Sequence, residues 1–223
     1  MSGTVWMSSI KSNGQIGMKQ GLRTKFYGHE WNPAEFEIPL EPDEVFEAMK
    51  QSSQGYPLVR EQMPEAGAVW NEKAFAKVGD ILAIGGFFAV RGELAEVLSR
   101  FDLGEGGLYP LPIYCADLKT PYPDKFFLLN FGCRKDTLLP ERSAKVSKFA
   151  IEKATGKQHW QIDSWKDDPV VWNAGALKGP DLWVEAFLYN KIFMSDALAR
   201  AIIGIGMKDV FALEECRVLG DAK

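Results

Sequence analysis

The chain has little of the residue types from which most catalytic and metal sites are built. Only two histidines, His29 and His159, and three cysteines, Cys115, Cys133 and Cys216, occur in 223 residues. Neither histidine has a partner at metal-ligand spacing and the cysteines form no C-x-x-C pair, so neither a metal site nor a disulfide framework is predicted. We expect the cysteines to be free thiols in a reducing compartment.

Signals for secretion and for membrane insertion are also missing. Residues 1–10 lack a basic region followed by a hydrophobic core, and no apolar run approaches the roughly 18 residues that a membrane span needs. The formal net charge of −4 argues against nucleic acid or an anionic membrane as a direct partner, because both favour a basic surface. We therefore expect a cytoplasmic protein.

Nucleotide-binding and hydrolase motifs are absent as well. The sequence has no P-loop, no G-x-G-x-x-G fingerprint, no H-E-x-x-H and no nucleophile elbow. The glycine-rich segment 104–107 follows a helical pattern rather than opening one, which is typical of a helix stop and not of a phosphate-binding loop. Nothing around Cys133 or His159 favours a catalytic pair between them. We expect no cofactor, no metal and no catalytic residue.

What the chain does contain is enough apolar sequence for a folded core, with 46% hydrophobic and 12% aromatic residues. Two stretches, 79–113 and 179–213, share a pattern of strands, a helix, a glycine stop and a further strand. The expected buried stripe is Leu94, Val97, Leu98 and Phe101 in the first helix, and Leu198, Ala201, Ile202 and Ile205 in the second. Ser195 suits the N-cap of the second helix, and Val210–Leu213 the strand after it.

The N-terminal third has weaker signals. Residues 5–7 and 25–27 are strand-like, and Asn13-Gly14 between them is a turn signal that favours a hairpin. Residues 51–72 are rich in Gln, Ser, Gly, Pro and Glu, which predicts a long surface connection.

A short acidic helix is predicted to begin at Pro42, because proline is tolerated in a first helical turn and the acids after it suit the positive end of the helix dipole. Val45, Phe46 and Met49 would form its apolar side. The acids of this region are Glu35, Glu37, Glu41, Asp43, Glu44 and Glu47, with no Lys or Arg among them. They form either a solvated helix start or a patch presented to a basic partner.

Two features of the middle of the chain complete the predicted fold. Residues 125–131 are the most hydrophobic run and a candidate central strand. Residues 149–152 and 159–162 predict a hairpin with a glycine in its loop, although 144–153 also suits a helix.

The fold class that follows is α+β, with a mixed, mostly antiparallel sheet packed with a few short helices and two weakly similar strand-helix-strand units. We expect a single domain over residues 1–223, which could be subdivided into 1–78 and 79–223.

The best candidate for a binding surface is the segment 163–172, because tryptophans in polar, turn-rich sequence are either buried or bind a partner. Its candidate residues are Asp163, Trp165, Asp167, Asp168 and Trp172. The same carboxylates could carry glycosidase-like or nuclease-like chemistry, which keeps an enzyme of unknown reaction as an alternative. A structural or assembly module is a third reading.

Several short motifs carry a resemblance to a known family. They are Gly79-Asp80, Phe88–Leu98, Gly107–Ile113, Phe126–Asn130, Pro-Asp-Leu-Trp at 180–183, Ile-Phe-Met-Ser-Asp-Ala-Leu at 192–198 and Gly-Met-Lys-Asp-Val-Phe at 206–211. In these motifs the chain resembles immunity family eleven of the bacterial polymorphic toxin systems. The first unit departs from the pattern, since Arg91-Gly92 stands where a Ser-Asp or Ser-Glu cap is expected.

The resemblance implies an antitoxin that binds and blocks a cognate secreted toxin, often a nuclease, inside the producing cell. It implies no catalytic residues, because the shared motifs are structural. Such an antitoxin would bind a basic toxin domain through acidic and aromatic loop residues, and the candidate set above contains both.

Overall fold

The computed structural model of the protein describes residues 3–16, 20–33, 42–144, 146–153, 155–162 and 170–218. The chain forms two compact units that alternate along the sequence. Unit 1 comprises Met1–Ser12, Phe101–Gly104 and Cys133–Lys223, and unit 2 comprises Asn13–Arg100 and Glu105–Gly132. Residues on both sides of position 78 therefore belong to unit 2, and the two units do not follow the subdivision expected from the sequence.

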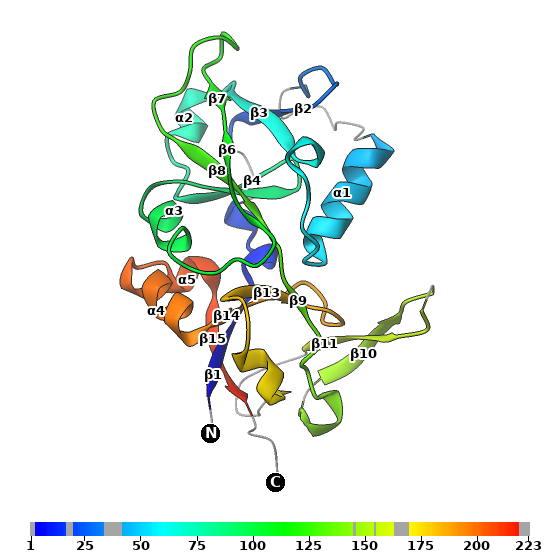
Figure 1. Ribbon diagram of the computed structural model, residues 1–223. Coiled ribbons are helices and arrows are strands. Elements are labelled where there is room, and N and C mark those ends of the chain that lie inside the picture. Colours follow the sequence, from blue (N-terminus) through cyan, green and yellow to red (C-terminus); the bar gives the residue numbers. More distant parts are fainter. Residues whose placement is uncertain are drawn as a thin grey trace. The chain divides into compact units, whose positions relative to one another are not determined.

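Unit 2 contains two sheets and three α-helices among its described residues (Figure 1). The four-stranded sheet has the order β4-β5-β8-β6, with every neighbouring pair antiparallel. Its strands are β4 (Ile81–Ile84), β5 (Phe87–Val90), β6 (Gly107–Leu111) and β8 (Phe126–Asn130). The three-stranded sheet consists of β2 (Leu22–Phe26), β3 (Pro64–Val69) and β7 (Ile113–Tyr114) in the order β2-β3-β7. The helices are α1 (Asp43–Ser53), α2 (Glu72–Phe75) and α3 (Gly92–Leu98).

The core of unit 2 lies between its two sheets. Phe26 and Val69 from the three-stranded sheet belong to the same buried cluster as Phe126 and Leu128 from β8. The hydrophobic run predicted as a central strand is β8, which lies between β5 and β6. Pro110 falls in β6 at the edge of the sheet, as expected for a residue that cannot donate a ladder hydrogen bond.

Unit 1 is organised around a six-stranded sheet with the order β12-β15-β1-β14-β13-β9. Its strands are β1 (Thr4–Ser8), β9 (Arg134–Lys135), β12 (Val171–Trp172), β13 (Leu182–Glu185), β14 (Ile192–Ser195) and β15 (Leu213–Val218). The helices are α4 (Asp196–Gly204) and α5 (Lys208–Phe211), and β10 (Val146–Ile151) and β11 (Gln158–Ile162) form a separate hairpin. The predicted hairpin is thereby confirmed, and the helical alternative for 144–153 is wrong.

The strand-helix-strand repeat is present as a repeat of topology. The order β4-β5-β8-β6 in unit 2 matches β13-β14-β1-β15 in unit 1, and in both cases all neighbours are antiparallel. In each unit a helix follows the second strand, α3 after β5 and α4 after β14. The third strand of the two sheets comes from different parts of the sequence. In unit 2 it is β8, which follows the repeat, and in unit 1 it is β1, from the start of the chain.

Three expectations about strands and their connections were wrong. Strand β1 pairs with β14 and β15 and not with β2, while Asn13-Gly14 leads into the 3-10 helix Gly14–Ile16. The connection predicted over 51–72 contains the buried strand β3. Finally, Val210 belongs to α5, and the last strand begins at Leu213.

The glycine-rich segment after the first repeat helix does not end that helix. Helix α3 already ends at Leu98, ahead of the glycines. Gly106 instead lies directly against Gly132, where a Cβ atom would come within 1.6 Å of the Gly106 nitrogen. The glycines therefore permit two backbone segments to pass closely, and Glu105 N donates to Gly132 O at 3.0 Å there.

Candidate functional site

The candidate loop 163–172 is described at its end alone. Asp163, Trp165, Asp167 and Asp168 lie outside the described residues. Trp172 is in β12 with 0% of its surface exposed, and its ring centroid lies 5.4 Å from that of Phe193. A side chain without exposed surface offers no contact to a partner, so the expectation that Trp172 binds a toxin does not hold in the folded chain.

Part of the acidic region presents a surface on α1 of unit 2. Val45, Ala48 and Ser52 are buried, and Met49 packs against the same core. Phe46 was expected on this apolar side, but its side chain is 60% exposed. The one-residue offset from Val45 carries Phe46 around the helix and away from the core.

The exposed face of α1 combines this aromatic ring with carboxylates. Asp43, Glu44 and Glu47 are exposed beside Phe46. Glu44 lies 3.3 Å from His29 Nε2, and Glu47 lies 3.3 Å from Lys50 Nζ. Three acids against one lysine leave the face acidic, so it suits a basic partner. We call Asp43, Glu44, Phe46 and Glu47 the acidic helix face.

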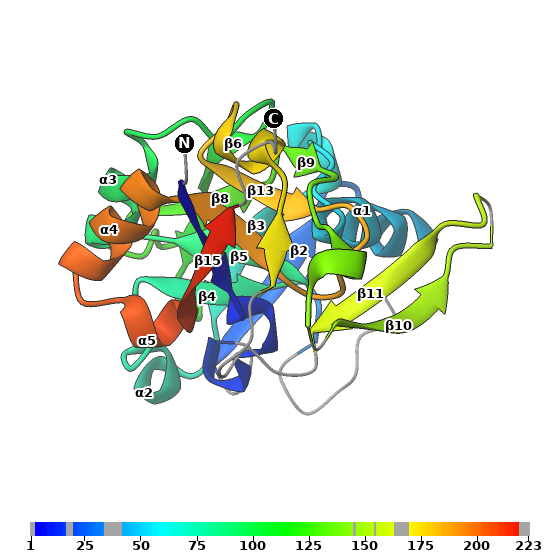
Figure 2. The same ribbon diagram turned by 90° about the horizontal axis from the view of Figure 1, so that it is seen from below.

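A second exposed apolar cluster lies on unit 1, where the β10–β11 hairpin projects away from the six-stranded sheet (Figures 1 and 2). Phe149 and Tyr189 stack at a centroid distance of 4.3 Å, and they are 48% and 54% exposed. Ile151 is 64% exposed. The hairpin also carries Lys148, Lys153 and Lys157 against one acid, Glu152, so its charge is the opposite of that of the acidic helix face.

A cleft with a volume of about 810 Å³ lies within unit 2, beside α3. Arg91 lines it, and its guanidinium lies 2.7 Å from Asp124 Oδ2 and 3.7 Å from Asp80 Oδ1. The same group donates to the carbonyl of Val78 and lies over the ring of Phe126 at 5.3 Å. Arg91 is thus already paired with groups of the chain itself.

The rest of the cleft combines apolar walls with two further charges. Leu108 and Phe127 contribute the apolar surface, and Glu96 and Lys125 contribute exposed charged side chains. Gly92, at the first position of α3, adds no side chain and has a φ of +54°. No sequence pattern pointed to this cleft, although the Arg91-Gly92 departure from the family pattern falls in it.

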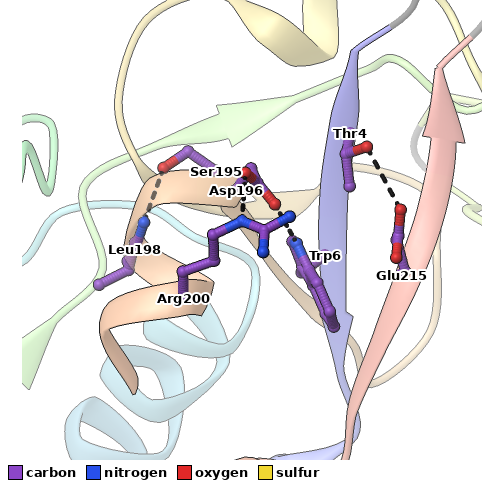
Figure 3. A network of polar contacts seen from close by, with 7 residues as sticks. All are labelled: Thr4, Trp6, Ser195, Asp196, Leu198, Arg200 and Glu215. Atoms are coloured by element: carbon purple, nitrogen blue, oxygen red, sulfur yellow. Dashed lines mark hydrogen bonds and ion pairs between the residues drawn. The ribbon is translucent and has the colours of Figure 1, made fainter. Parts of the chain in front are cut away.

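In unit 1 a polar network lies at the start of α4 (Figure 3). Asp196 accepts a hydrogen bond from Trp6 Nε1 at 2.9 Å and another from Arg200 Nε at 2.7 Å. The bonds from Arg200 and Trp6 hold the pKa of Asp196 below its ordinary value. Ser195 caps α4 by accepting from Leu198 N at 3.2 Å, which confirms the predicted N-cap.

The histidines and Cys216 have structural surroundings in the described part of the chain. His29 pairs with Glu44, and His159 packs edge-on against Phe187. Burial raises the pKa of the Cys216 thiol to about 12. Within the described part of the chain, no group of three or more His, Cys, Asp or Glu side chains is placed to hold a metal ion.

None of the described helices has the length and apolar character needed to cross a membrane. No model of a known protein family matches the chain, and no curated protein matches it.

Proposed function

We propose that the chain is an immunity protein, which acts in the cytoplasm by binding a basic toxin domain and blocking it through stoichiometric association. The observation that carries the proposal is Phe46, a large aromatic side chain that is 60% exposed on the acidic helix face. The resemblance of the repeat motifs to immunity family eleven supports the same function.

The acidic helix face has the composition of a charge-steered interface. Aromatic side chains are enriched in protein interfaces, and a patch of one charge speeds encounter with a partner of opposite charge. The helix is anchored from behind by Val45 and Ala48, so the face is held in place before a partner arrives. A basic toxin domain meets both requirements.

The test is binding to the toxin domain encoded beside this chain, measured by calorimetry with purified proteins. We expect a 1:1 complex in which toxin activity is lost in proportion to the chain added. Phe46→Ala should weaken binding about 30-fold, the effect of losing a hot spot of about 2 kcal/mol. The Asp43→Lys, Glu47→Lys double variant should slow association most at low salt.

Ile151→Ala on the hairpin is the matched control, because Ile151 is exposed to a similar extent and lies on a basic surface. It should leave the affinity unchanged, and neither substitution should lower the melting temperature, since both side chains lie outside the cores. The proposal fails if the neighbouring domain forms no complex, or if toxicity is lost at far less than equimolar chain, which would indicate an enzyme.

A further inference from the structure

The cleft of unit 2 and the polar network of unit 1 occupy equivalent places in the repeat. In each unit a backbone hydrogen bond links the start of the first repeat strand (β4 or β13) to the end of the second (β5 or β14). Arg91 N donates to Asp80 O at 2.9 Å, and Ser195 N donates to Asp181 O at 2.9 Å. Asp80 therefore corresponds to Asp181, and Arg91 to Ser195.

Strand register extends the correspondence into the sheets and helices. Phe127 pairs with Val90, the residue before Arg91, and Trp6 pairs with Met194, the residue before Ser195. The corresponding pairs that concern the cleft are Phe127 with Trp6, Gly92 with Asp196, and Glu96 with Arg200. The last two pairs are the first and fifth residues of α3 and α4.

In unit 1 this place holds a guanidinium group of the chain itself. Arg200 lies on a carboxylate, Asp196, that the Trp6 indole also contacts (Figure 3). In unit 2 the equivalent helix position is Gly92, and the equivalent of the indole is the Phe127 ring, which has no N–H donor. The cation is replaced by Glu96. Where unit 1 has an arginine paired with an aspartate, unit 2 thus has a cleft with a carboxylate at its rim.

The charges of the cleft favour a cation over an anion. Arg91 is already satisfied by Asp80 and Asp124. An anion would have to displace one of these carboxylates. Glu96 is exposed and forms no ion pair with any residue in the described ranges, so its carboxylate is available to a guanidinium. Phe127 and Leu108 supply an apolar wall for the alkyl stem of a long cationic side chain.

We propose that this cleft binds the guanidinium of an arginine side chain, placed between Glu96 and the Phe127 ring, at the place in the repeat where unit 1 has the guanidinium of its own Arg200. The proposal rests on the proposed function in one respect, since it takes the arginine to belong to the basic toxin domain. The site itself is a property of the chain and is testable without that partner.

The test is a titration of the full-length, isotope-labelled chain with N-acetyl-arginine amide, followed through its backbone amide resonances. We expect shifts confined to 92–96 and 127 that saturate with a single dissociation constant. N-acetyl-citrulline amide, which has the same shape without the charge, should bind at least about tenfold more weakly. Glu96→Gln should weaken the arginine amide by a similar factor, and Lys125→Ala should tighten it by removing a like charge.

Glu93→Gln provides the matched control, because Glu93 is an exposed carboxylate on the same helix that does not line the cleft. It should leave the affinity unchanged. Equal binding of citrulline amide, or shifts that do not depend on Glu96, would overturn the proposal. If the arginine amide does not bind but the toxin domain does, and Phe46→Ala weakens toxin binding, this site is wrong while the proposed function stands.

Discussion

The indole nitrogen of Trp6 donates a hydrogen bond of 2.9 Å to Oδ1 of Asp196, and this bond joins the N-terminal strand to the first turn of α4. Strand β1 lies between β14 and β15, so residues near the start of the chain pair with two strands from its last third. Unit 1 therefore depends on the first residues of the chain for the middle of its sheet.

Replacing Trp6 with Phe should measure this link. The substitution removes the donor to Asp196 and introduces the residue type that unit 2 has at the equivalent position, Phe127. We expect the free energy of unfolding of unit 1 to fall by about 2 kcal/mol, as for loss of a hydrogen bond to a charged group. Arg200→Ala, which removes an exposed partner of the same carboxylate, should cost much less, because solvent screens an exposed ion pair. Equal effects from the two variants in urea unfolding would contradict this ranking.

The Asp196 carboxylate should also make the free energy of unfolding depend on pH. Hydrogen bonds from Arg200 and Trp6 lower the folded-state pKa of Asp196 below its ordinary value of 3.8. Its contribution to stability is therefore present above 3.8 and is lost as the pH falls through the folded pKa. The Asp196→Asn variant has no titrating group at this position. Its free energy of unfolding should be lower than that of the parent chain at pH 5, and the difference should shrink as the pH falls to about 3. A deficit that grows over this range would show the opposite sign.

Local sequence patterns predicted the elements whose signal is contained in a few neighbouring residues. The all-apolar run around Leu128 is a central strand, and the Ser195 cap begins α4 where expected. The place of β1 was not predictable in this way, because pairing of Val5 with Cys216 depends on residues far apart in the sequence. Periodicity also leaves an exposed aromatic such as Phe46 looking like a core residue.

The candidate site was predictable in part. The acids of α1 were recognised as a possible patch, and three of them are exposed. Trp172 was assigned to a polar loop because of its acidic neighbours, although Val170 and Val171 directly before it carry the apolar signal of a buried strand. The cleft was not predictable, because Gly92 lines it at the position where α4 of the other unit begins with Asp196, and no local pattern in the sequence marks that difference.

Glu185 should act as a buried anchor in unit 1. Its carboxylate accepts from Leu138 N at 2.9 Å, from Thr137 Oγ1 at 3.0 Å and from Trp183 Nε1 at 3.3 Å, and also from Thr137 N. Glu185→Ala leaves these donors buried without an acceptor, so we expect a loss of at least about 3 kcal/mol in the free energy of unfolding. Thr137→Ser keeps the hydroxyl donor and should cost less than half as much. Similar losses for both would contradict an anchoring role.

Ionisation of Glu185 should oppose folding despite those donors. Burial is the largest influence and raises its pKa above the ordinary value of 4.5. The folded chain then holds the proton more tightly than the unfolded chain, and stability from this group falls as the pH rises from 4.5 through the folded pKa. The unfolding free energy of the parent chain minus that of Glu185→Gln should decrease across this window in urea titrations. An increase would mean that the carboxylate is stabilised by its surroundings.

Gly132 should tolerate no side chain. A Cβ atom there would lie 1.6 Å from Gly106 N and 2.5 Å from Gly106 Cα, both of which are backbone atoms that have no rotamer to change. We expect Gly132→Ala to destabilise unit 2 by about 3 kcal/mol through overpacking. Gly204→Ala, at the last position of α4 with open space around it, should instead stabilise unit 1 by about 0.5 kcal/mol. Thermal unfolding of the two variants distinguishes a steric effect from a general intolerance of substitution.

Cys216 should report the opening of unit 1. Its side chain is 7% exposed, and burial raises its pKa to about 12, so almost none of the thiol is ionised in the folded chain. In a Cys115→Ser, Cys133→Ser variant we expect it to react with a disulfide reagent at pH 8 about a thousandfold more slowly than an exposed cysteine. The same variant with Cys115 restored should add a faster phase, because that side chain is partly exposed. Urea below the unfolding transition should accelerate Cys216 alone. A rate within tenfold of the exposed thiol in the absence of urea would mean that β15 separates from β1 readily, and that the N-terminal strand is held far less firmly than its central place in the sheet implies.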